Sequence, residues 1–216
     1  MHAIRDHVLM TRWVQETMPI RGRIRAMTRI IAGEFGGRRL KVPDDGTRPT
    51  SDRVREAVFS VLGARIEFDD ARVLDLYAGS GALAIEAVSR GAASAVLVDS
   101  RSRATSVVAA NLRSLGIAGR TRVVTAPVAS FLSEAGARDA ESAGFDLVFS
   151  DPPYALETDE VEADLRRLAS AWLADDAVVV VERDVRSTPP TWPEVFDVIV
   201  EKVYGETRVQ VGRFTP

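Results

Sequence analysis

The sequence contains no cysteine, and its only histidines are His2 and His7, at the extreme N-terminus. The lack of cysteine excludes disulfide bonds, thiolate metal sites and a cysteine nucleophile. Because the main body of the chain has no histidine, a Ser-His-Asp triad, a histidine metal site and a histidine general base are excluded there too. Any chemistry must therefore use carboxylates, backbone groups and a cofactor, and we expect no bound metal.

Long hydrophobic runs are also missing, since no apolar stretch approaches the roughly 18 residues of a membrane-spanning helix. The first residues mix charged with apolar side chains and are unlike a signal peptide. The chain has 216 residues, 46% of them hydrophobic and 27% charged, which is typical of one globular domain with an appendage. We therefore expect a cytoplasmic protein that makes no membrane contact.

Charge is unevenly distributed along the chain. Residues 1–65 hold 13 Lys and Arg against 7 Asp and Glu, a balance of +6, whereas the remainder hold 15 against 24, a balance of −9. A basic N-terminal third on an acidic body favours a polyanionic partner such as nucleic acid. The alternative is that these basic residues only decorate a solvated face. The candidate contacts in this region are Arg38, Arg39, Lys41 and Arg48.

The first third of the chain predicts a hairpin and a helix. Residues Thr28–Pro43 contain two β-prone runs around a Gly-containing turn, which is typical of a β-hairpin. Thr50 and Ser51 can cap a helix that runs to Leu62, because the apolar residues that follow have helical spacing.

Further along, strand and helix patterns alternate strictly. Because the strands are continuously apolar, the alternation predicts a parallel sheet covered by helices on both faces, the doubly wound, Rossmann-like α/β fold. The last two strands face each other across Gly205 and predict an antiparallel C-terminal hairpin. The expected strands are Val73–Leu76, Ala95–Val98, Val123–Val124, Phe145–Ser150, Ala177–Glu182, Phe196–Tyr204 and Thr207–Phe214, and the expected helices are Gly81–Arg90, Arg101–Leu115 and Glu160–Trp172.

These patterns divide the chain into three parts. Residues 1–27 are a basic N-terminal extension that could be disordered, or they could result from an upstream start codon. Residues 28–47 form the N-terminal β-hairpin, which we expect to contact nucleic acid. Residues 48–216 form the α/β domain.

The first strand and turn of this domain, VLDLYAGSGALAIEA, predict a nucleotide-type cofactor site. Gly79 and Gly81 allow the backbone to approach a ligand at the N-terminus of the next helix, and Asp99 ends the second strand, where a carboxylate can bind ribose hydroxyls. GSGALA also fits the NAD fingerprint, and small residues can simply permit tight packing. Asp75 favours S-adenosylmethionine, since a carboxylate before the glycines suits a cationic amino group and repels a pyrophosphate.

The segment FSDPPYALE predicts the reaction type. Each proline fixes φ and lacks an amide donor, so the segment cannot close its polar groups into regular structure. The carboxylate of Asp151 and the carbonyl of Pro152 could grip the two N–H bonds of a nucleobase amine, with Pro153 keeping the carbonyls clear of other donors. Tyr154 offers a ring on which the base can stack, worth roughly 1–3 kcal/mol. Orientation would then supply most of the rate. Alternatively, the segment only terminates a strand.

Together, DLYAGSGAL, VLVDS and DPPY resemble the amino-group branch of the class I S-adenosylmethionine-dependent methyltransferases. From about Arg29 to Phe214 the chain resembles the bacterial RsmD family, on IIAGEFGGRRL, RPTSDRVREAVFSVL, AGSGALAIEAVSRGA, DPPY and KVYGETRV. The resemblance implies methylation of the exocyclic N2 of a guanine in 16S ribosomal RNA, within an assembling small ribosomal subunit. We expect the enzyme to be a monomer.

The resemblance also implies roles for individual residues. Asp151–Tyr154 fall on the target amine. The segment Arg48–Arg55, with Arg53 and Arg55, lies over the cofactor and near the RNA. Where the family has an Asp that reads the adenine, this chain has Ala126-Pro127, so that Thr125 or a backbone carbonyl would substitute. The implied cofactor residues are Thr50, Asp75, Tyr77, Ala78, Gly79, Gly81, Asp99, Ser100 and Ala126.

Three other functions remain open on the sequence. A DNA amino-methyltransferase acting on adenine N6 or cytosine N4 would use the same DPPY chemistry, although the chain shows no separate target-recognition domain. An NAD(P)-dependent oxidoreductase would fit the glycine loop but has no use for FSDPPY. A non-catalytic RNA-binding module is disfavoured by the intact Asp75, Asp99 and DPPY.

Overall fold

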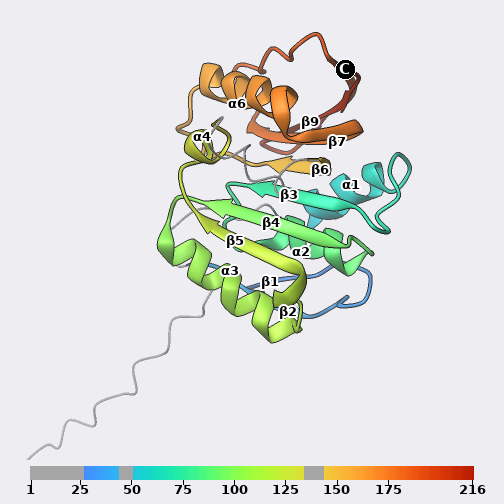
Figure 1. The fold of residues 1–216 in the computed structure, drawn as a ribbon, viewed down its shortest axis with the longest axis vertical. Coiled ribbons are helices and arrows are strands. Elements are labelled where there is room, and N and C mark those ends of the chain that lie inside the picture. The colour runs from blue at the N-terminus through green and yellow to red at the C-terminus, as the bar shows by residue number, and fades with distance from the viewer. Residues whose placement is uncertain (1–26, 44–50, 134–143) are drawn as a thin grey trace, which may run out of the picture.

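The structure is a computed structural model that describes residues 27–43, 51–133 and 144–216 (Figure 1). The proposed N-terminal extension, apart from Met27, lies outside the described residues, and so do Arg48 and Thr50. Met27 is the first residue of a strand and does not belong to the extension. In the described ranges, no helix is long and apolar enough to cross a membrane.

A seven-stranded mixed sheet forms the centre of the molecule, in the order β5-β4-β3-β6-β7-β9-β8. Strands β3 to β7 are parallel to one another, and β9 pairs antiparallel with both β7 and β8. This confirms the doubly wound α/β fold with an antiparallel C-terminal hairpin. The strands are β3 (Arg72–Leu76), β4 (Ser94–Asp99), β5 (Thr121–Thr125), β6 (Phe145–Ser150), β7 (Leu173–Asp184), β8 (Phe196–Tyr204) and β9 (Thr207–Phe214).

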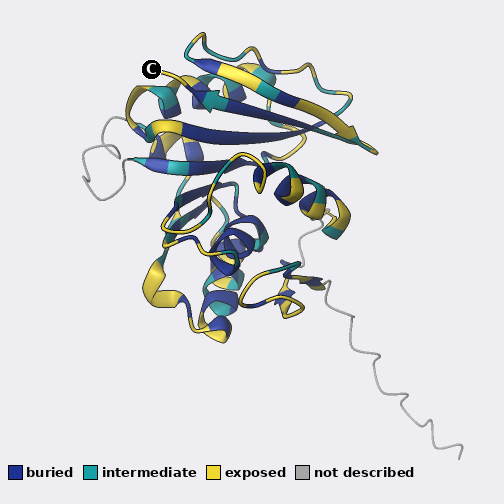
Figure 2. Ribbon diagram, turned by 90° about the vertical axis from the view of Figure 1, so that its right-hand side faces the viewer, coloured by how far each residue is buried: buried dark blue, intermediate teal, exposed yellow. Residues whose placement is uncertain are grey.

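Helices cover both faces of this sheet (Figure 1). One face packs against α1 (Asp52–Leu62), α2 (Ala82–Ser89) and α3 (Ser102–Leu115), and the other against α4 (Val128–Phe131) and α6 (Thr158–Ala171). The 3-10 turn η1 (Ala118–Arg120) and the short α4 were not expected. Figure 2 shows the central strands and α2 almost wholly buried.

Two predicted elements are longer than their apolar patterns. Strand β5 has five residues, because its partner β4 pairs it along its whole length although its side chains are only partly buried. Strand β7 begins at Leu173, four residues before the apolar run AVVVVE, and its pairing with β6 shifts register there.

The N-terminal hairpin is confirmed as a small separate sheet of β1 (Met27–Arg29) and β2 (Arg39–Lys41). Buried polar side chains fasten it to the helices. The carboxylate of Glu86 accepts the amides of Ile31 and Ala32 at 2.6 and 3.0 Å. The Asn111 amide accepts from the Lys41 backbone N–H at 2.9 Å and donates to the Lys41 carbonyl at 2.9 Å. The hairpin is therefore held in a fixed position over α2 and α3.

Candidate active site

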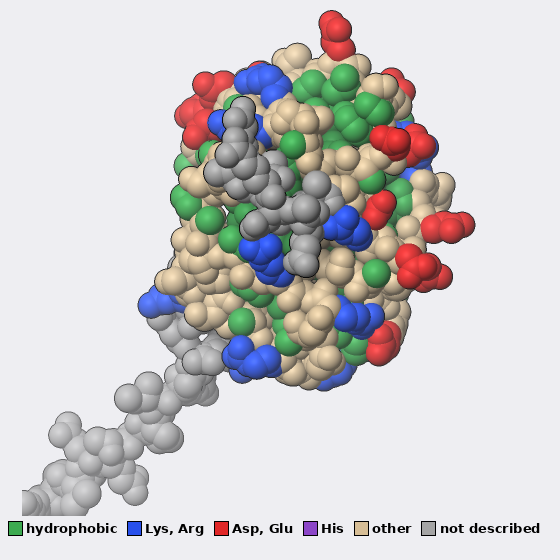
Figure 3. All heavy atoms as spheres, viewed as in Figure 1, with side chains coloured by type: hydrophobic (Ala, Val, Ile, Leu, Met, Phe, Trp, Pro, Cys, Tyr) green, Lys and Arg blue, Asp and Glu red, His purple; other side chains and the backbone are tan. Residues whose placement is uncertain are grey.

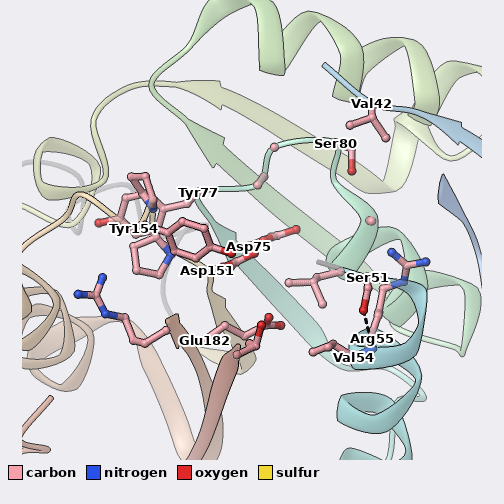
Figure 4. Close-up of a pocket in the computed structure, with 18 of the residues that line it drawn as sticks. Val42, Ser51, Val54, Arg55, Asp75, Tyr77, Ser80, Asp151, Tyr154 and Glu182 are labelled. Carbon is pink, nitrogen blue, oxygen red and sulfur yellow. Dashed lines mark hydrogen bonds between the residues drawn. The ribbon is translucent and has the colours of Figure 1, made fainter. Parts of the chain in front are cut away.

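A cavity of about 810 Å³ opens at the carboxyl ends of the central strands. This is where doubly wound sheets bind ligands, and the volume lies within the usual range for small-molecule sites. In the sheet, β3 lies between β4, the next strand in the chain, and β6, which comes later in the chain. The strand order therefore reverses between β3 and β6. Figure 4 shows Asp75, Asp151 and Glu182 directed to the middle of the cavity, between Tyr154 on one side and α1 on the other.

Five carboxylates line this cavity. Four of them lie in, or directly after, four adjacent strands of the sheet, and the fifth, Glu206, lies in the turn between β8 and β9. In β3, Val73 packs on the face of α1 to α3, whereas Leu74 and Leu76 pack on the opposite face. Because side chains alternate along a strand, Asp75 points to the α1–α3 face. The same alternation holds in the other strands, so all four acids share that face. In sheet order they are Asp99 (β4), Asp75 (β3), Asp151 (after β6) and Glu182 (β7).

The loop between β3 and α2 is shaped by positive φ angles. Tyr77 has φ 62°, unusual for a residue with a side chain, and Gly79 has φ 57°. A Cβ on Gly79 would have only one neighbour within 4 Å, at 3.9 Å, so the backbone is open to a ligand there. At Gly81 (φ 77°), a Cβ would approach the Leu97 side chain to 2.9 Å, so this glycine also serves helix–sheet packing.

Asp75 is almost completely buried, and its Oδ2 accepts the amide of Ala84 in the first turn of α2 at 3.1 Å. The pKa of the Asp75 carboxyl is raised to about 8, mainly by burial and also by the charges of Asp151 and Asp99, against the lowering effect of the Ala84 hydrogen bond. A cation in the cavity would relieve this cost, which suits a positively charged ligand group.

Asp75→Asn should change how stability depends on pH. The folded wild type holds a proton on Asp75 up to about pH 8, whereas the unfolded chain releases it near pH 3.9. The folded state thus binds more protons between these values, and its free energy of unfolding falls as the pH rises through this window. Asparagine removes this penalty, so we expect the variant to gain on the order of 4 kcal/mol relative to wild type as the pH rises from 5 to 8.

Urea unfolding at the two pH values measures this difference. Asp175→Asn, an exposed change on β7, is the matched control. An Asp75→Asn variant with the same pH dependence as wild type would contradict the role given to the buried proton.

Asp99, which is 4% exposed, accepts hydrogen bonds from two segments at the end of β4, namely the loop after β3 and the turn after β4 itself. Its Oδ2 accepts the Gly79 amide at 2.9 Å, and its Oδ1 accepts the Arg101 backbone amide at 2.9 Å. The Arg101 guanidinium donates to both oxygens, at 3.1 and 3.2 Å. A diol that binds this carboxylate would therefore compete with Arg101.

After β6, the DPPY segment leaves the sheet as a tight turn. Pro152 is buried and Tyr154 is 58% exposed at the mouth of the cavity. The Pro153 carbonyl accepts the Leu156 amide at 2.9 Å, and the Leu156 carbonyl accepts from Arg183 of β7 at 2.8 Å. Arg183 thus ties the far side of the turn, beyond Tyr154, to the sheet.

Most residues singled out from the sequence lie around this cavity. Gly81 and Ala126 are not among the lining residues, and the Thr125 hydroxyl pairs with Thr105 at 2.8 Å. Tyr77 lines the cavity, yet its hydroxyl donates to Asp164 of α6 at 2.6 Å. The candidate residues that line the cavity are Arg53, Arg55, Asp75, Tyr77, Ala78, Gly79, Asp99, Ser100, Asp151, Pro152, Pro153 and Tyr154.

Arg55 is placed differently from the expected RNA-facing position. It is 1% exposed and donates to the Thr28 hydroxyl at 3.1 Å, to the carbonyl of Arg29, and to Asp52 at 3.0 Å. Its guanidinium therefore joins α1 to the hairpin from inside, and this position supports a structural role in place of RNA contact.

The sequence reasoning missed several lining residues. Glu182 and Arg183 lie near the end of β7. Asp99 and Asp151 are predicted because they follow apolar runs at strand ends, and the same rule would have found these two residues. Val42 and Pro43 bring the hairpin to the cavity. The turn between β8 and β9, Val203–Thr207, also reaches it, and only the long-range pairing of β9 with β7 explains that position. No cluster of three or more metal-ligating side chains occurs within the described ranges.

A doubly wound sheet with a glycine loop, acids at the strand ends and DPPY after β6 defines a class I methyltransferase. The family model described as "Conserved hypothetical protein 95" matches residues 28–213. The chain therefore belongs to this family, the RsmD family.

Individual relatives agree with this assignment. The chain is 41% identical to "Ribosomal RNA small subunit methyltransferase D" of Escherichia coli K12, over 82% of this chain and 85% of that protein. The solved structure of yhhF from Escherichia coli superimposes with a TM-score of 0.75 at 37% identity, over 88% of this chain and 99% of that one. Magnesium protoporphyrin IX methyltransferase from Synechocystis, solved with bound SAM, shares the fold at a TM-score of 0.58 and 15% identity, over 76% of this chain and 79% of that one.

Proposed function

We propose that this protein transfers a methyl group from S-adenosylmethionine to the exocyclic N2 of a guanine in 16S rRNA of the small ribosomal subunit. The observation that carries this proposal is the position of Asp-Pro-Pro-Tyr, which faces the β3–α2 glycine loop within one cavity. The name of the Escherichia coli relative supports ribosomal RNA as the substrate.

The residues of the cavity fit S-adenosylmethionine. The buried Asp75 carboxylate suits the cationic amino group at the methionine end, and Asp99 suits the ribose hydroxyls. The open backbone at Gly79 leaves room for the ligand between them. When bound, the cofactor supplies an electrophilic methyl group on a sulfonium. Ala126 does not line the cavity, so we assign it no contact with the adenine of the cofactor.

Asp151 and Pro152 would act on the target amine. That amine is a weak nucleophile because its lone pair is delocalised into the ring. Two acceptors on its N–H bonds, the Asp151 carboxylate and the Pro152 carbonyl, favour tetrahedral geometry and aim the lone pair at the methyl carbon. The Asp151 carboxylate or solvent would take the proton that the amine loses on accepting the methyl group. Tyr154 holds the extruded base by stacking.

A methyl-transfer assay tests this function. Purified enzyme and tritiated S-adenosylmethionine are incubated with undermethylated small subunits, free 16S rRNA or DNA, and the product nucleoside is identified by mass. We expect N2-methylguanosine from the ribosomal substrates. Label in N6-methyladenine or N4-methylcytosine of DNA would replace the proposal with a DNA amino-methyltransferase, and absorbance change with a nicotinamide cofactor would replace it with an oxidoreductase.

The RNA is proposed to approach over the N-terminal hairpin. Val42 and Pro43 of the hairpin line the cavity, and Arg39 and Lys41 of β2 are exposed beside them. Arg38 is exposed as well, with its guanidinium hydrogen-bonded to the Ser114 carbonyl at 2.6 Å. Figure 3 shows Lys and Arg side chains scattered over one face, including its lower part, whereas Asp and Glu lie mainly at its right margin and at its upper left.

Arg39→Ala and Lys41→Ala should each weaken RNA binding. Each removes one exposed charge, so we expect a several-fold loss of affinity and a decrease of about 1 in the slope of log affinity against log salt. Filter binding of 16S rRNA between 50 and 200 mM salt measures both. Arg166→Ala on α6, on the other face of the sheet, is the matched control. An unchanged slope in both hairpin variants would show that Arg39 and Lys41 do not contact the RNA.

A further inference from the structure

Glu182 is a buried carboxylate of the cavity that the proposed reaction does not use. It is 2% exposed and lines the cavity near the end of β7. Burying a carboxylate is costly unless donors face it. A carboxylate that lines the cavity can accept hydrogen bonds from a ligand that presents N–H groups.

Strand register places Glu182 beside Asp151. Val181 of β7 pairs with Ser150 of β6, so Glu182 and Asp151 follow at the same level. Neighbouring strands lie roughly 4.8 Å apart, and both side chains belong to the α1–α3 face. In the row of acids, Glu182 lies on the side of Asp151 away from Asp75 and Asp99. If Asp151 binds the target amine, Glu182 faces the part of the base that extends away from the cofactor.

The three nucleobases with an exocyclic amine differ in the ring atom beside it. In guanine, the amine N2 adjoins N1–H, a donor, on one side and N3, an acceptor, on the other, and the N1 side distinguishes this base. In adenine, the amine N6 adjoins N1, an acceptor, and in cytosine the amine N4 adjoins N3, also an acceptor. An ionised carboxylate only accepts hydrogen bonds. A second carboxylate next to Asp151 therefore matches guanine and meets a repelling lone pair in adenine or cytosine.

We propose that Glu182 accepts the N1–H of the target base and thereby selects guanine over adenine and cytosine. This inference rests on the proposed function and identifies the residue that determines its specificity. It also explains how DPPY, which is suited to any of the three amines, acts on guanine in this protein. A hydrogen bond from N1–H to a carboxylate additionally pushes electron density towards N2.

The test uses 2-aminopurine, which keeps the amine at position 2 but has an acceptor at N1. The methylated nucleotide is first mapped with wild-type enzyme, and small-subunit RNA is then prepared with guanine or 2-aminopurine at that position. We expect wild type to prefer guanine by about ten- to a hundredfold in kcat/KM, the discrimination typical of a paired base edge. In Glu182→Gln, the amide can donate to N1 of 2-aminopurine, so this preference should fall about tenfold or more.

The preference is a ratio measured on one enzyme preparation, so a loss of folded protein cancels from it. Glu194→Gln, at an exposed loop residue, is the matched control and should keep the wild-type ratio. If Glu182→Gln keeps the wild-type ratio and the wild-type enzyme methylates guanine, this inference is overturned and the proposed function is upheld. No wild-type transfer to guanine N2 at all would overturn both.

Discussion

Asp151→Asn is expected to lower the rate of methyl transfer by about a hundred- to a thousandfold, with S-adenosylmethionine binding nearly unchanged. Removing one preorganised group that stabilises a transition state has an effect of this size. The asparagine keeps the shape of the side chain but replaces one acceptor with a donor, which repels the N–H of the target amine. Single-turnover transfer of a tritiated methyl group gives the rate, and calorimetry gives cofactor affinity.

Asp75 provides a second readout for the same variant. The charge of Asp151 is one of the causes that raise the pKa of Asp75. Removing it should lower that pKa towards its ordinary value, so cofactor binding should reach its full affinity at a lower pH than in wild type. Asp175→Asn is the matched control on the same sheet. Transfer at the wild-type rate in Asp151→Asn would refute the proposed hydrogen bond from the target amine to Asp151.

The ends of the strands are the part of the site that sequence patterns predict well. Asp75, Asp99 and Asp151 each follow an apolar run, and the carboxyl ends of parallel strands meet at one edge of a sheet. Their convergence in one cavity therefore follows from the parallel arrangement that the alternating strands and helices predict. Glu182 ends the run AVVVVE in the same manner, and the same reasoning applied to this run would have placed it in the cavity.

The N-terminal arginines show where such reasoning fails. Arg53 and Arg55 lie in one basic stretch, yet Arg53 is exposed and Arg55 is buried. The spacing holds a signal, because Arg55 precedes the buried Phe59 by four residues and so shares its helix face. Its partners, however, are groups of the hairpin far away in the sequence, and only the folded chain brings them together. The positive φ of Tyr77 likewise has no local sequence signal.

Asp99→Ala is expected to weaken the binding of S-adenosylmethionine by about a hundredfold. A ribose that binds this carboxylate donates two hydroxyl groups to it, and hydrogen bonds to a charged group contribute about 1.5–3 kcal/mol each. Calorimetry with S-adenosylhomocysteine measures the affinity, and the 2′-deoxy analogue separates ribose contact from loop distortion. Wild type should bind the deoxy analogue more weakly than the parent, whereas Asp99→Ala should bind the two almost equally.

Arg101→Ala serves as the control for the turn, because Arg101 and Gly79 share the Asp99 carboxylate in the structure. This variant removes the guanidinium that a ribose must displace but keeps the acceptor. We therefore expect it to bind the cofactor at least as tightly as wild type and to keep the preference for ribose over deoxyribose. If Arg101→Ala lost as much affinity as Asp99→Ala, the ion pair would be needed to hold the turn in shape. If Asp99→Ala lost none, the ribose would bind elsewhere in the cavity.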